Sequence, residues 1–133
     1  MSVHNQYGLF FRIKLISFRN EIPKKNAICS QSIETSLTYE MANFINDYDN
    51  FIYRDDLHGI IEEIQEILDG TWDGIEEEDD NLKISPSGFE SIRLDLVDGN
   101  AYFISFDGTE LGIPLTDLKA IFEEWEEFVA NIE

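Results

Sequence analysis

The sequence predicts an α+β protein: an antiparallel sheet of about five strands packed on one face by two amphipathic helices, in the order β-β-α-β-β-β-α. Two segments with apolar residues at helical spacing, 55–69 and 115–131, predict the helices. Segments of alternating apolar and polar residues, separated by turn signals, predict the strands. The length of 133 residues and the lack of an internal repeat or linker favour one domain spanning residues 1–133.

The first strand is expected in residues 9–18, LFFRIKLISF, which alternate with a period of two. Arg12 and Lys14 mark its wetter face. Residues 19–30 contain a proline and two lysines and predict a loop.

Residues 31–41 also alternate, which favours a second strand. A helix over 37–48 is the rival interpretation. The chain from 42 to 54 is left open between a loop and a short strand.

The two helices have clear boundaries. Asp55 or Asp56 is suited to cap the first helix, and Gly70 follows its end. Pro114 ends a strand just before the second helix. One apolar stripe on each helix is expected in the core: Leu57, Ile60, Ile64, Ile67, Leu118, Ile121, Phe122, Trp125 and Phe128.

Residues 82–106 predict a meander of short strands. The Asp98-Gly99-Asn100 segment is a strong hairpin signal, and Asp107-Gly108 predicts a further turn.

The charge is strongly acidic and unevenly distributed. Nine Lys and Arg face 28 Asp and Glu, a formal net charge of −19. Residues 1–25 hold five basic residues and one acid, whereas residues 26–133 hold four basic residues and 27 acids. Such a field repels nucleic acid and anionic membranes and attracts cationic proteins. The role of the basic N-terminal segment stays open.

A single cysteine, Cys29, rules out an intramolecular disulfide and suits a reducing compartment. The N-terminus lacks the pattern of a secretory signal, and no apolar run is long enough to span a membrane. We therefore expect a cytoplasmic protein that contacts neither membrane nor nucleic acid.

Signatures of catalysis are weak. His4 is expected at a mobile terminus, His58 on the polar edge of the first helix, and Cys29 as a semi-buried side chain. Asp47 and Asp49 lack the glycine and the terminal glutamate of a calcium loop. We expect no catalytic residues, no metal and no cofactor.

The candidate binding surface is the outer face of the first helix and the acidic loop after it. Trp72, in that loop, is either a partner anchor or a lid over the helix end. The predicted partner-binding residues are Glu62, Glu63, Glu66, Trp72, Asp73, Glu76, Glu77, Glu78, Asp79 and Asp80.

The small size, acidity, absence of a catalytic motif and closing segment IPLTDLKAIFEEWEEFVANIE resemble the immunity proteins of bacterial contact-dependent growth inhibition and related polymorphic toxin systems. The resemblance implies an inhibitor that covers the active site of a cognate basic toxin, often a nuclease, and that is a monomer or a weak dimer when free. The alternatives are a small hydrolase or metal-dependent enzyme using scattered carboxylates, and an adaptor domain that uses a sheet edge.

Overall fold

The computed structural model describes residues 2–17, 19, 22–48, 56–72, 81–84, 92–96, 98–105 and 107–132, with the backbone alone for 81–84. Its elements follow in the order α1 (Val3–Gln6), β1 (Leu9–Ile16), β2 (Lys24–Gln31), α2 (Ser36–Asn46), α3 (Asp56–Asp69), β3 (Asn81–Ile84), β4 (Ile92–Asp95), β5 (Asn100–Ile104), β6 (Glu110–Pro114) and α4 (Leu115–Ala130). The class is α+β, as the sequence predicts.

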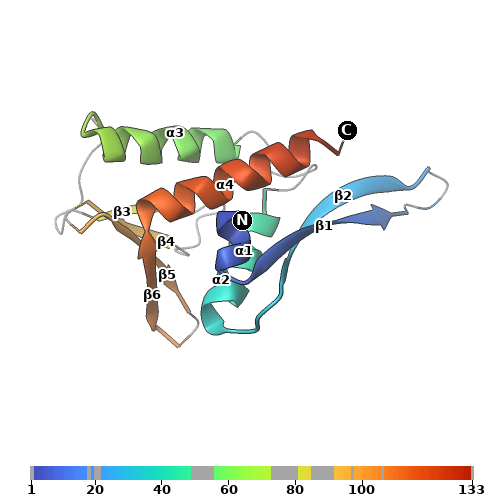
Figure 1. Cartoon of the computed structure of the whole chain (residues 1–133), viewed down its shortest axis with the longest axis horizontal. Coiled ribbons are helices and arrows are strands. Elements are labelled where there is room, and N and C mark those ends of the chain that lie inside the picture. Colours follow the sequence, from blue (N-terminus) through green and yellow to red (C-terminus); the bar gives the residue numbers. More distant parts are fainter. Residues whose placement is uncertain are drawn as a thin grey trace.

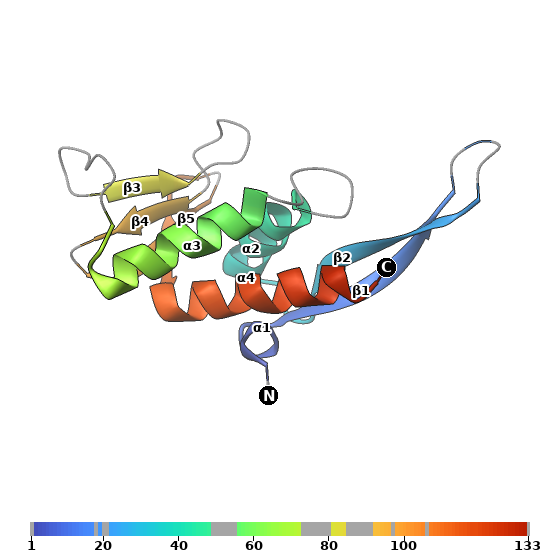
Figure 2. The same cartoon turned by 90° about the horizontal axis from the view of Figure 1, so that it is seen from above.

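The strands form two antiparallel sheets rather than the single predicted sheet. β1 and β2 form a two-stranded hairpin, and β3-β4-β5-β6 form a four-stranded meander in that order. Both views show the hairpin projecting from the rest of the molecule as a long twisted arm (Figures 1 and 2). We call β1 and β2 together the arm.

The predicted loop over 19–30 is wrong in its second half, because β2 begins at Lys24. β1 and β2 pair along their whole length, from Leu9 opposite Gln31 to Ile16 opposite Lys24. Lysines and Asn26 are poor strand formers, but the ladder to β1 satisfies their backbone groups. Tertiary pairing therefore overrides the local loop signal.

The predicted strand over 31–41 is also wrong, since Ser36–Asn46 form helix α2. Thr35 caps it: its Oγ1 accepts from the Thr38 backbone N–H, and the Thr38 hydroxyl accepts from the Thr35 N–H. Leu37 and Met41 lie four residues apart, a spacing that places two residues on one side of a strand and also on one face of a helix. These two residues therefore do not distinguish a strand from a helix. Tyr39, which a strand would bury beside them, is 54% exposed.

The two predicted helices and the meander are confirmed. The helix predicted at 55–69 is α3, and the one at 115–131 is α4. Gly70 ends α3 with a φ of 76°, and the Thr71 N–H donates to the Glu66 carbonyl in a Schellman motif. Gly99 takes a φ of 74° in the turn between β4 and β5.

One hydrophobic cluster joins α2, α3, α4, the inner face of the four-stranded sheet and the inner end of the arm. Of the predicted core side chains, Ile60, Ile67 and Phe128 are only partly buried. The others are buried: Leu57, Ile64, Leu118, Ile121, Phe122 and Trp125. Trp125 is fully buried, and its indole N–H donates to the Tyr48 carbonyl at 2.9 Å.

Candidate functional site

Helices α3 and α4 lie side by side along one flank of the molecule (Figure 2). Their apolar stripes face inward, so their polar residues lie on the outside and along the rims. Together these helices carry ten carboxylates and one lysine. We call this pair of helices the acidic layer; its carboxylates are Asp56, Glu62, Glu63, Glu66, Asp69, Asp117, Glu123, Glu124, Glu126 and Glu127.

Two carboxylates of the acidic layer hold the N-terminal helix in place. Glu124 accepts the backbone N–H groups of Val3 and His4, each at 2.9 Å, and its Oε1 lies 2.7 Å from His4 Nδ1. Burial raises the pKa of Glu124, but these hydrogen bonds outweigh it and leave the pKa below its usual value. His4 also stacks on Phe11 with ring centroids 3.7 Å apart, so the expectation of a mobile His4 is wrong.

Tyr7 makes the second anchor, because its hydroxyl donates to Asp117 at 2.5 Å. Burial, and then this contact, raise the pKa of Tyr7 to about 12. Glu124 and Asp117 are thus structural residues. The remaining carboxylates of the acidic layer are the ones that a partner could contact.

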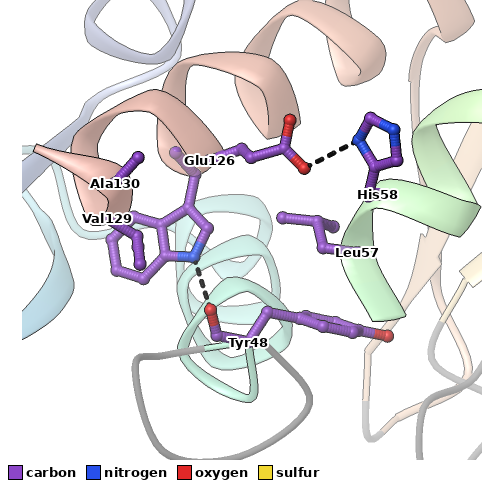
Figure 3. A pocket seen from close by; sticks show the side chains of 7 residues that line it. Tyr48, Leu57, His58, Glu126, Val129 and Ala130 are labelled. Carbon is purple, nitrogen blue, oxygen red and sulfur yellow. Dashed lines mark hydrogen bonds and ion pairs between the residues drawn. The ribbon is translucent and has the colours of Figure 1, made fainter. Parts of the chain in front are cut away.

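His58 joins the two helices from the surface. Its Nε2 lies 2.9 Å from Glu62 on α3 and its Nδ1 3.1 Å from Glu126 on α4 (Figure 3). The side chain is 61% exposed, as expected for a surface histidine. The hydrogen bond to Glu126, the charge of Glu126 and the charge of Glu62 raise the pKa of His58. Such a histidine neutralises part of the acidic layer below its pKa.

A pocket of about 340 Å³ lies beside His58, lined by Tyr48, Leu57, Trp125, Glu126, Val129 and Ala130 (Figure 3). Two contacts lie within its lining: Glu126 Oε2 meets His58 Nδ1, and the Trp125 indole N–H donates to the Tyr48 carbonyl. The residues that line this pocket include no serine, threonine, cysteine or lysine beside His58 and Glu126.

Trp72 folds back on α3. Its indole N–H donates to Glu63 Oε1 at 3.1 Å, and its backbone N–H donates to the Glu66 carbonyl. The ring is therefore a lid over the helix end rather than a projecting side chain, and it lies next to Glu63 in the acidic layer.

The structure brings together four of the predicted binding residues: Glu62, Glu63, Glu66 and Trp72, all on or against α3. The other six, Asp73, Glu76, Glu77, Glu78, Asp79 and Asp80, lie outside the described residues. Sequence reasoning left out the α4 carboxylates Glu123, Glu126 and Glu127. Their helical spacing marked them as outward-facing, but the pairing of α4 with α3 was needed to join them to the candidate surface.

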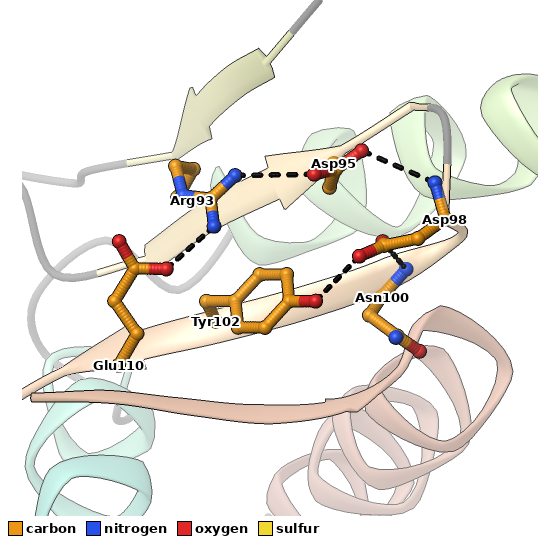
Figure 4. Close-up of polar contacts among 6 residues, drawn as sticks. All are labelled: Arg93, Asp95, Asp98, Asn100, Tyr102 and Glu110. Atoms are coloured by element: carbon orange, nitrogen blue, oxygen red, sulfur yellow. Dashed lines mark hydrogen bonds and ion pairs between the residues drawn. The ribbon is translucent and has the colours of Figure 1, made fainter.

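A second polar cluster covers the outer face of the four-stranded sheet (Figure 4). Arg93 Nη2 lies 2.5 Å from Glu110 and Nη1 3.3 Å from Asp95, and the guanidinium stacks 4.5 Å from the centre of the Tyr102 ring. The Tyr102 hydroxyl donates to Asp98. Arg93 is thus paired with Asp95 on its own strand and with Glu110 on β6.

Cys29 is 3% exposed, and burial raises the pKa of its thiol to about 12. It is more deeply buried than the semi-buried position expected. Among the described residues no group of three or more His, Cys, Asp or Glu could hold a metal ion. Within that same part of the chain, no helix is long and apolar enough to cross a membrane.

Searches of protein-family models, curated proteins and solved structures find no match to this chain.

Proposed function

We propose that this chain is a binding protein whose acidic layer contacts a basic protein partner, in the manner of an immunity protein that covers the active site of a cationic toxin. The observation that carries the proposal is the acidic layer itself: ten carboxylates and one lysine on two adjacent helices. The resemblance in size and acidity supports the toxin as the class of partner.

The electrostatics favour a partner over simple solubility. Glu62 and Glu66 on α3, and Glu123 and Glu127 on α4, are four residues apart on one helix, so their Cβ atoms lie about 5–6 Å apart. That distance is within the screening length of about 8 Å at physiological salt. These charges therefore repel each other in the free protein, and a cationic surface relieves that repulsion on binding. The same field accelerates encounter with a cationic protein.

The test begins with the reading frame adjacent to this gene in its native host. That frame is expressed in a heterologous bacterium with and without this chain, and growth is measured. We expect the neighbour to arrest growth alone and this chain to restore it. Growth arrest that this chain does not relieve, or a neighbour with no effect on growth, contradicts the toxin part of the proposal.

The acidic layer is tested by neutralising Glu62, Glu66 and Glu127 to Gln. We expect the association rate with the purified neighbour to fall by about tenfold at low salt, since this is the range of steering effects. The control neutralises Asp47, Asp107 and Glu110, three exposed acids outside the acidic layer, and circular dichroism verifies that both variants fold. Equal losses in the two variants would show that only net charge matters.

A further inference from the structure

The outer half of the arm has apolar side chains that are exposed within the described part of the chain. On the core-facing side of β1, Leu9 is fully buried and Phe11 packs edge-on against Trp125. The next two residues of the same side, Ile13 and Leu15, are 49% and 64% exposed. The apolar stripe of a half-buried strand therefore continues beyond the body, which marks this end of the arm as a contact surface.

The arm is also basic. Strands β1 and β2 contain Arg12, Lys14, Lys24 and Lys25 and no acidic residue. All four side chains are exposed, in a chain whose net charge is −19. The occupant of this surface must combine apolar groups with carboxylates. Pairing of two arms alone would bring like charges together.

The chain carries a surface of that composition at the inner end of the same arm. A groove of about 530 Å³ lies between the end of β2, the start of α2 and Ser105, and Glu34, Tyr39 and Glu40 line it. Ile33, next to it along the chain, is 60% exposed. Burial raises the pKa of Glu40, so a nearby cation would stabilise its charged carboxylate.

We propose that the outer half of the arm docks into the β2–α2 groove of a second copy of this chain, and that the two copies exchange arms in a two-fold symmetric dimer. An arm cannot reach its own groove, because a paired strand of eight residues spans about 27 Å away from it. When the arms of two copies point in opposite directions, the outer end of each arm reaches the groove of the other copy. The contact is then self-complementary and closes at two copies.

This dimer covers the exposed apolar residues of both surfaces. Seven large hydrophobic residues are exposed in the described part of the chain. Six of them lie on the arm, between its two strands, in the segment after it, or at the groove: Phe10, Ile13, Leu15, Ile22, Ile33 and Tyr39. Only Leu68 lies elsewhere, on α3. The acidic layer is not used, so the dimer leaves the proposed partner surface open.

The experiment is sedimentation velocity over a concentration series of the whole chain, at low and at high salt. We expect a reversible dimer whose dissociation constant rises at least tenfold with salt, since exposed charges are screened over about 3 Å at 1 M compared with 10 Å at 0.1 M. A chain that remains monomeric at every concentration in low salt overturns the proposal.

Two charge-reversed variants locate the contact. In the first, Arg12→Glu, Lys14→Glu and Lys25→Glu make the arm acidic; in the second, Glu34→Lys and Glu40→Lys make the groove basic. Each variant alone repels itself at both contacts and should be monomeric. Their equimolar mixture pairs an acidic arm with a basic groove and a basic arm with an acidic groove, so it should form a heterodimer.

The control variant is Glu62→Lys with Glu66→Lys on α3, which should dimerise like the unmodified chain or more tightly through its lower net charge. Circular dichroism verifies that each variant folds. Dimers in either single variant, or no dimer in the mixture of folded variants, overturn the arm-exchange geometry.

Discussion

The two sheets follow the same alternating pattern, but only one of them is covered along its length. In the four-stranded sheet every inward residue of the described strands β4 and β5 is buried, namely Ile92, Leu94, Ala101 and Phe103. In β1, burial stops after Phe11, although the apolar pattern continues through Leu15. On the partner strand β2, Asn26 and Ala27 are still buried, and only Lys24 and Lys25 at its outer end are exposed. Alternation therefore specifies a strand, whereas burial depends on which other elements extend over it.

The position of α4 accounts for the difference. This helix follows directly from β6 and ends at Ala130, and its Trp125 and Phe128 rings pack on Phe11 of the arm. Beyond that point no described element lies against the core-facing side of β1. The four-stranded sheet, by contrast, has α4 and α2 packed on its inner face.

The largest expected effect is at Trp125, which belongs to the core and also covers the inner end of the arm. Trp125→Ala should lower the free energy of unfolding by about 3–5 kcal/mol, because it leaves a cavity and removes the hydrogen bond from the indole N–H to the Tyr48 carbonyl. Urea denaturation followed by circular dichroism measures it. A loss below ~1 kcal/mol would mean that the core around Trp125 and the inner end of the arm is not tightly packed.

A smaller effect is expected on the outer face of the four-stranded sheet. A Cβ at Gly112 would lie 2.7 Å from the Tyr102 ring, which Arg93 and Asp98 hold in place. Gly112→Ala should cost about 1–3 kcal/mol by overpacking. In a Tyr102→Ser background the same substitution should cost much less, and equal costs in both backgrounds would rule out the clash.

The next effect concerns Glu124, which holds α1 next to Phe11, the last covered residue on the core-facing side of β1. Glu124→Gln should cost about 1–2 kcal/mol at neutral pH, because the amide keeps one acceptor oxygen but loses the charge that raises such hydrogen bonds to about 1.5–3 kcal/mol. The folded pKa of Glu124 is depressed, so this stability is present above the ordinary value of 4.5 and is lost as pH falls through the folded pKa. The two unfolding curves should therefore converge in acid; a constant difference down to that range would contradict the role of the carboxylate.

The smallest effect is expected at the outer end of the arm. Ile13→Ser with Leu15→Ser should change the unfolding free energy of the monomer, measured at low concentration, by less than ~0.5 kcal/mol each, since both side chains are already exposed. The matched control is Leu9→Ser at the fully buried end of the same strand, which should be strongly destabilising. Equal losses at both ends would show that the arm is covered in the monomer.

Secondary structure could be predicted from the sequence where the local pattern and the tertiary packing favour the same element. Helices α3 and α4 have long apolar stripes with capping signals, and the Asp98-Gly99 turn demands a positive φ, so these elements were predictable. β2 was not, because its lysines and Asn26 form a strand only by pairing with β1. α2 was ambiguous because Leu37 and Met41 fit both periods, and only Thr35 with Thr38 pointed to a helix start.

The same limit applies to the candidate site. The α3 carboxylates and Trp72 were predicted from one helix and its following loop. The contribution of α4 and the bridging role of His58 depend on helix pairing, which no local pattern encodes. The anchoring of α1 through Glu124 joins residues 120 positions apart in the chain and was equally out of reach.

The burial of Cys29 makes the arm's attachment measurable by chemistry. The thiol lies opposite Phe11, at the point where the arm leaves the body, and it is both inaccessible and held protonated. A thiol-reactive reagent can modify it only when this junction opens, because both solvent access and the thiolate are needed. The modification rate, divided by that of an unfolded control, gives the fraction of molecules in which this junction is open. The Cys29 thiol is thus a native probe of local opening between the arm and the body.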